Sequence, residues 1–333
     1  KVLLDTGEGI PEYIPLLQEA LDREPGTERA TISKVICSHW HHDHVGGIQD
    51  VLSFLAARNI QLHNPPTSAA DASSTAAPNH VAKGLVDIDT SLSSAPTGIF
   101  KFPCPDRDDP ETRFQTIQDR DIIKVDDQTT LLTLHTPGHT SDHCSFYLKE
   151  ENTLFTADCV LGQGTAVFED LGSYIRSLER QLNFSEGSIG SVGGGGDASP
   201  SYKIYPGHGP IIEDGPAKIR DYIKHRFERE RQVLAVLSST NSNTGGDEDT
   251  GSAKTSTTTT ATGNGAVGKT AMDIVKVIYQ AYPVNLHLPA QHQILLHLKK
   301  LEEDGKVKRG GEQIVEDIED VVWELLPQTQ ANL

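Results

Sequence analysis

Cysteine, long apolar runs and basic charge are all scarce in this sequence of 333 residues. The four cysteines form no C-x-x-C pair, and three of them lie in apolar, strand-like runs, where we expect buried free thiols in a reducing, intracellular compartment. No apolar run is long enough to cross a bilayer, so we expect no membrane partner. The net charge of −18 excludes a polybasic surface over the whole molecule, although it leaves a local nucleic-acid groove open.

The order of apolar runs and turns predicts layered α/β structure followed by a small module. We expect a large domain over residues 1–237, a disordered linker rich in Ser, Thr, Gly and Asn over 238–268, and a module over 269–327. In the module two helices precede a turn and two short strands, which is typical of a winged helix. Because Lys1 lies inside a predicted strand, we expect the first strands of the large domain, and any targeting peptide, to be missing from this sequence.

A dense group of metal-binding side chains follows the apolar run 34–37, which predicts a buried strand. The next segment, 38–47, reads Ser-His-Trp-His-His-Asp-His-Val-Gly-Gly. Extended chain points residues two apart to the same side, so we expect His39 and His41 to hold one ion and Asp43 and His44, past the next bend, to hold a second. A histidine-rich surface loop is the alternative, which the preceding buried strand disfavours.

Three further strands end in a metal-capable side chain, namely His139, Asp158 and His208. A carboxylate at the end of an apolar strand is costly to bury alone, and a metal would explain Asp158 as a bridge between two ions. The expected ligands are His39, His41 and His139 for one ion, and Asp43, His44 and His208 for the other. This donor set suits two Zn²⁺, with Mn²⁺ or Fe²⁺ as alternatives. Two such ions about 3.5–4 Å apart support hydrolysis by a bridging hydroxide, with Asp43 orienting the nucleophile.

At this point the sequence resembles the metallo-β-lactamase superfamily. The resemblance rests on H-x-H-x-D-H at 39–44, Gly-His at 138–139 and 207–208, and the strand-end Asp158. It implies an αββα sandwich with the metals at one edge, between the two sheets. It also implies that Asp5, in the turn after the strand 1–4, braces the metal loops and is not a ligand.

Further motifs are similar to the β-lactamase-like protein 2 family, including Leu4–Glu8, Thr136–Thr140, Tyr205–Pro210 and the tail segment 285–302. This resemblance implies an endoribonuclease that cleaves single-stranded RNA, in the mitochondrial matrix or the cytoplasm. The same motifs are similar to fungal hydrolases that release polyketides from an acyl carrier protein. An acyl thioesterase acting on a carrier protein or coenzyme A is therefore the alternative. The tail favours the endoribonuclease. A metal-bound scaffold without catalysis is disfavoured, because every ligand type is present.

The predicted winged module has two open interpretations. Residues 271–326 contain six basic and ten acidic residues, and the basic ones gather near the turn and wing. A small positive face for RNA and a lid or homodimerisation surface fit this pattern equally well. The segment 263–270 also matches G-x-x-x-x-G-K-T, but it follows a threonine-rich linker and not a strand. We therefore expect Thr270 to be the N-cap of the next helix.

Overall fold

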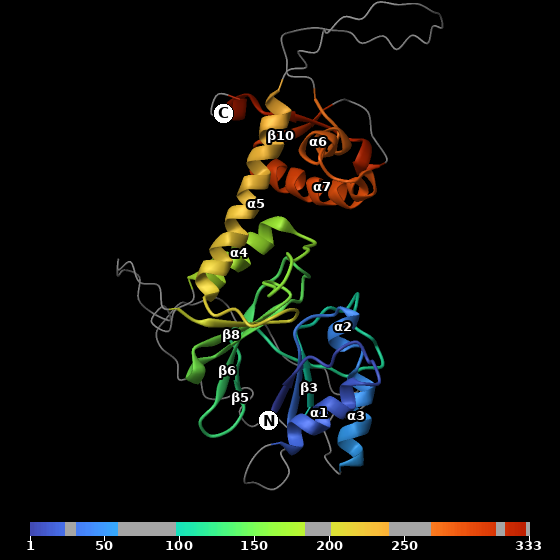
Figure 1. The fold of residues 1–333 in the computed structure, drawn as a ribbon, viewed down its shortest axis with the longest axis vertical. Helices are drawn as coiled ribbons and strands as arrows, with labels where there is room; N and C mark the ends of the chain where they lie inside the picture. The colour runs from blue at the N-terminus through green and yellow to red at the C-terminus, as the bar shows by residue number, and fades with distance from the viewer. Residues whose placement is uncertain (24–30, 59–97, 184–200, 240–267, 311–316, 331–333) are drawn as a thin grey trace, which may run out of the picture. The chain divides into compact units, whose positions relative to one another are not determined.

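The computed structural model describes residues 1–23, 31–58, 98–183, 201–239, 268–310 and 317–330. The chain divides into two compact units, Lys1–Tyr222 and Ile223–Leu333 (Figure 1). The division falls within the long helix α5, Gly215–Ser238. The domain boundary predicted at residue 237 lies at the end of that helix. Nearly all of the predicted linker lies outside the described residues.

The first sheet is wholly parallel and has the strand order β1-β2-β3-β4. Its strands are β1 (Val2–Leu4), β2 (Lys34–Cys37), β3 (Gly98–Lys101) and β4 (Gln115–Thr116). Every residue of β2 and β3 is buried, as parallel strands covered on both faces require. Helices α1 (Tyr13–Asp22) and α3 (Ile48–Ala57) cover one face and share an apolar cluster with β2 and β3 (Figure 1).

The second sheet is mixed, with the order β5-β6-β7-β8-β9 and only its last pair parallel. Its strands are β5 (Ile122–Lys124), β6 (Thr130–His135), β7 (Cys144–Leu148), β8 (Thr153–Ala157) and β9 (Lys203–Pro206). Ile36 and Phe100 of the first sheet pack against Phe146 of the second. Helix α4 (Leu171–Leu182) packs on the second sheet's side, where the Tyr174 hydroxyl donates to the Cys159 carbonyl at 2.6 Å. The predicted αββα sandwich is thereby confirmed.

The second unit is a winged helix built around apolar side chains. Its elements are α6 (Ala271–Ile278), η2 (Val284–Leu286), α7 (His287–Glu303), β10 (Val307–Gly310), η3 (Ile318–Asp320), β11 (Val322–Leu325) and α8 (Pro327–Gln330). Strands β10 and β11 pair antiparallel as the wing. Trp323, Ile294 and Leu298 are completely buried in the core, which the last turns of α5 complete.

Local signals set the ends of the module's helices. Thr270 caps α6 and forms a reciprocal capping box with Asp273, which confirms the N-cap prediction. Helix α6 ends at Ile278, and Pro283, which disfavours helical backbone at Tyr282, keeps the helix from extending to that residue. Helix α7 begins at His287, since a proline is tolerated in a first turn. Among the described residues, no helix combines the length and apolarity needed to cross a bilayer.

Candidate metal centre

The first ligand loop leaves the buried strand β2 in extended form and then turns into a short helix, α2 (His42–Val45). His41 keeps extended backbone as the N-cap, with φ −60° and ψ 145°. This geometry separates the histidines before the bend from Asp43 and His44 on the helical turn. His42 is exposed and lies in neither ligand group. The predicted division of the loop is thus present, although sequence analysis did not anticipate a helix here.

Two glycines allow this loop to lie against the turn that follows β1. A Cβ atom on Gly47 would lie 2.2 Å from the Thr6 carbonyl oxygen, and one on Gly46 would lie 2.9 Å from the Glu8 carbonyl oxygen. Both contacts are with backbone, which cannot move aside as a flexible side chain can. The glycine pair is therefore required by close approach of two chain segments.

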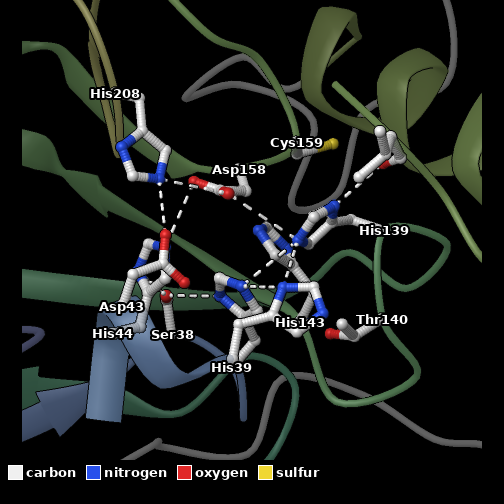
Figure 2. Close-up of polar contacts among 12 residues, drawn as sticks. Ser38, His39, Asp43, His44, His139, Thr140, His143, Asp158, Cys159 and His208 are labelled. Atoms are coloured by element: carbon white, nitrogen blue, oxygen red, sulfur yellow. Dashed lines mark hydrogen bonds and ion pairs between the residues drawn. The ribbon is translucent and has the colours of Figure 1, made fainter. Parts of the chain in front are cut away.

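The first ligand group consists of His39, His41 and His139, of which Figure 2 labels His39 and His139. His39 Nε2 lies 3.0 Å from His41 Nδ1 and 3.2 Å from His139 Nε2. His41 Nδ1 and His139 Nε2 are 3.0 Å apart. His139 Nδ1 donates to the Val167 carbonyl oxygen at 2.8 Å, which leaves Nε2 as the unprotonated atom facing the group. Burial lowers the pKa of all three histidines, so they are neutral at pH 7, as metal ligands must be.

The second group consists of Asp43, His44, Asp158 and His208 (Figure 2). His208 Nε2 lies 3.0 Å from Asp43 Oδ2 and 3.4 Å from Asp158 Oδ2. Asp158 Oδ1 lies 3.3 Å from His44 Nε2, and Asp158 Oδ2 lies 3.8 Å from His139 Nε2 in the first group. Asp158 therefore stands between the two groups, in the bridging position that its sequence context predicts.

The residues present fit divalent cations. His44 Nε2 and Asp158 Oδ1 are buried and form an ion pair at 3.3 Å, and neither meets a hydrogen-bond criterion with any other described residue. Burial lowers the pKa of His44, but the Asp158 and Asp5 carboxylates outweigh it and raise this pKa to about 10. The second group thus favours positive charge at this point, which a metal ion supplies in place of the proton. All seven predicted ligands are brought together, while metal binding itself stays a prediction.

Asp5 and Ser38 orient the ligands from behind. Asp5 accepts from the Ser38 backbone N–H at 2.7 Å and contacts His44 Nδ1 at 2.8 Å, while the Ser38 hydroxyl lies 2.9 Å from His39 Nδ1. Asp5 and Ala157, next to ligand loops, both have left-handed backbone, with φ +60° and +42°. Such strain in non-glycine residues gathers at functional sites. The family resemblance predicts the bracing role of Asp5 but says nothing of Ser38, although the position of Ser38 directly before His39 was a usable signal.

His143 lies beside the centre without joining it. The ring is completely buried, and its Nδ1 lies 2.9 Å from the Thr136 hydroxyl. Its ring centroid is 5.3 Å from that of His39, and it belongs to neither ligand group. This side chain is a hydrogen-bonded core histidine packed behind the ligands.

Comparison with known proteins agrees with this geometry. The Metallo-beta-lactamase superfamily matches residues 1–208, and the Beta-lactamase associated winged helix domain matches residues 270–316. The chain therefore belongs to the metallo-β-lactamase superfamily and is a hydrolase of that class with a candidate divalent-metal site.

Individual relatives match most of the chain. Over 311 residues the chain is 32% identical to the Beta-lactamase-like protein 2 homolog of Drosophila melanogaster. The aligned region covers 92% of this chain and 80% of the relative. Over 245 residues it is 32% identical to the Atrochrysone carboxyl ACP thioesterase of Emericella nidulans, covering 73% and 59% of the two chains. A crystal structure of a Beta-lactamase domain protein from Burkholderia ambifaria shares the fold, with a TM-score of 0.60, 14% identity, and coverage of 98% and 82%.

Proposed function

We propose that this protein is a metal-dependent endoribonuclease that cleaves single-stranded RNA. The observation that carries the proposal is the pair of ligand groups joined through Asp158, because two-metal sites of this kind are suited to displacement at phosphorus. When bound, divalent ions at the two groups would activate water and stabilise charge on the phosphate. Similarity to the Beta-lactamase-like protein 2 homologues over both units supports the same substrate class.

The side chains of this chain have separate tasks in that reaction. The Asp43 carboxylate is 42% exposed and lies 3.0 Å from His208, so it can both ligate and accept a proton from an attacking water. The water oxygen forms a bond to phosphorus, the ester P–O bond breaks, and a proton ends on the leaving oxygen. Asp5 and Ser38 keep the ligand rings in place during this step.

The winged helix offers little free positive charge for RNA. Of the six basic side chains in residues 271–326, five have a carboxylate within 4 Å; these are Lys276, Lys300, Lys306, Lys308 and Arg309. Neutralised cations add little to phosphate binding. We therefore assign RNA binding to the unit that holds the metal centre.

Acyl thioester hydrolysis is the second candidate. A hollow of about 350 Å³ beside the second ligand group has apolar walls that include Phe146, Phe155 and Tyr205. Such a surface suits an acyl chain, and one relative is named a carboxyl ACP thioesterase. In this reaction the same water would attack a carbonyl carbon and release a thiol.

A paired turnover assay on the full chain separates the candidates. Protein loaded with zinc or manganese is given a labelled single-stranded RNA in one arm and an acyl thioester in the other, each repeated with His41→Ala. RNA cleavage that is lost in the variant supports the endoribonuclease. Turnover of the thioester alone contradicts it and supports the second candidate.

A further inference from the structure

A second hollow lies on the outer side of the first ligand loop. It measures about 250 Å³, and its lining includes Trp40, His42, Arg107 and Phe114. None of these four residues belongs to either ligand group. Trp40, however, sits in the chain directly between the ligands His39 and His41, so the hollow adjoins the metal centre through one side chain.

Trp40 links Arg107 to the metal centre. Its indole ring makes an edge contact with the ring of His41, with centroids 4.4 Å apart. The Arg107 guanidinium lies over the same indole, 4.8 Å from the ring centroid. A cation held over tryptophan is attracted by the ring's electron density, so Arg107 is kept near the ligands although its side chain is exposed.

Two of the three acidic residues beside Arg107, Asp108 and Asp109, are engaged elsewhere, while Asp106 is exposed. Asp108 accepts from the Cys104 backbone N–H and pairs with the buried ammonium of Lys101. Asp109 accepts from the Glu111 N–H and the Thr112 hydroxyl. In the part of the chain that the structure describes, the Arg107 side chain forms no ion pair or hydrogen bond. Its planar set of N–H donors is thus available to an incoming anion.

We propose that Arg107 binds a phosphate of the RNA strand that flanks the scissile phosphate, with Trp40 holding the guanidinium in register with the metal centre. This inference rests on the proposed endoribonuclease function and identifies Arg107 as a residue that positions the RNA strand for it. A guanidinium matches phosphate oxygens with two parallel hydrogen bonds, which an ammonium cannot reproduce. The flanking phosphate therefore fixes which ester bond lies over the ligand groups.

The test compares Arg107→Met with Arg107→Lys in metal-loaded full-length protein, using a labelled single-stranded RNA. Arg107→Met should raise KM about 10- to 100-fold, because hydrogen bonds to charged groups are the strong ones. The plot of log(kcat/KM) against log salt concentration should lose about 0.7 in slope, the share of one phosphate contact in single strands. Arg107→Lys should restore the slope and only part of KM.

A neutral methylphosphonate placed in turn at each phosphate then locates the contact. At one flanking position the methylphosphonate should weaken RNA binding to the wild type. The same RNA should bind Arg107→Met no more weakly than unmodified RNA does. Arg176→Met, which removes an exposed arginine of α4 outside the hollow, is the matched control. Bound metal is measured in every variant and should stay at the wild-type level.

The outcomes separate this inference from the function on which it rests. If the wild type cleaves RNA and Arg107→Met keeps the wild-type KM and salt slope, the phosphate contact is wrong and the endoribonuclease stands. Loss of bound metal in Arg107→Met would also overturn it, because the residue would then act through the ligands. If the wild type cleaves no RNA, both proposals fall.

Discussion

The two units differ in the polar side chains that they bury completely. In the first unit the completely buried residues include His39, His143 and Asp142. In the second, the completely buried residues include Trp323, Ile294 and Leu298 of an apolar cluster. Polar burial costs stability unless each group is paired, whereas apolar burial contributes it directly. The first unit therefore combines apolar clusters with the buried polar side chains of the candidate metal centre, whereas the second unit is built on an apolar cluster with few buried polar side chains among its described residues, such as Glu230 and His297.

Replacing Asp158 with Ala should have the largest effect on activity. It removes the carboxylate that stands between both ligand groups, so bound metal and turnover should fall together, turnover by more than about 100-fold. Metal content is measured by mass spectrometry beside the turnover assay. Asp127→Ala is the control, because that side chain is 100% exposed. Full turnover in Asp158→Ala would refute the assigned centre.

Trp323→Ala should cause the largest loss of stability, and only in the winged helix. Removing a completely buried indole costs about 3–5 kcal/mol through lost burial and the cavity left behind. Hydrogen exchange of α7 amides, measured by mass spectrometry, should speed up accordingly while metal content is retained. Leu288→Ala, at a residue 69% exposed in the same unit, should change exchange little. Equal effects of the two substitutions would contradict the described core.

Asp5→Asn should weaken metal binding without abolishing catalysis. Asparagine tolerates the left-handed backbone at this position, so the change isolates the carboxylate charge that orients His44. Metal affinity should fall about 10- to 100-fold, as for other residues that support ligands. Excess metal in a titration should restore turnover here but not in Asp158→Ala. Failure of rescue would mean that Asp5 does more than orient ligands.

A pH effect on the second unit should be the smallest. Burial, and then the charges of Arg226, Arg229 and Lys300, lower the pKa of His297 to about 3. The unfolded chain takes up this proton near pH 6.5 and the folded chain does not, so stability is full above that pH and declines toward pH 3. The free energy of unfolding should fall by at most about 1.4 kcal/mol for each pH unit below 6.5. Urea midpoints from pH 7 to 5 check it, and His297→Leu should flatten the dependence.

Sequence patterns anticipated most of the fold and the membership of both ligand groups, because those signals are local. The spacing of His39, His41, Asp43 and His44 after a buried strand is visible in one short segment. The same spacing does not predict the helix α2, because its four residues are too few to show a helical period.

Long-range partners explain what the sequence analysis missed. Strand β3 was not predicted because it ends in Lys101, a residue rarely buried. The buried ammonium is satisfied by Asp108 and by Asp142, which lies far along the chain. The contact between Arg107 and Trp40 also joins residues far apart in the sequence, so no local pattern predicts it.

The chain contains two tryptophans, and each unit holds one of them. Each has an arginine guanidinium over its ring, but Trp40 is only partly buried beside the candidate ligand His41, while Trp323 is completely buried in an apolar cluster. Their emission spectra should differ, because an indole in a polar, half-buried setting emits at longer wavelength than one away from water. With Trp40→Phe and Trp323→Phe, ordinary fluorescence would follow cation loading at one unit and unfolding of the other, with no attached dye.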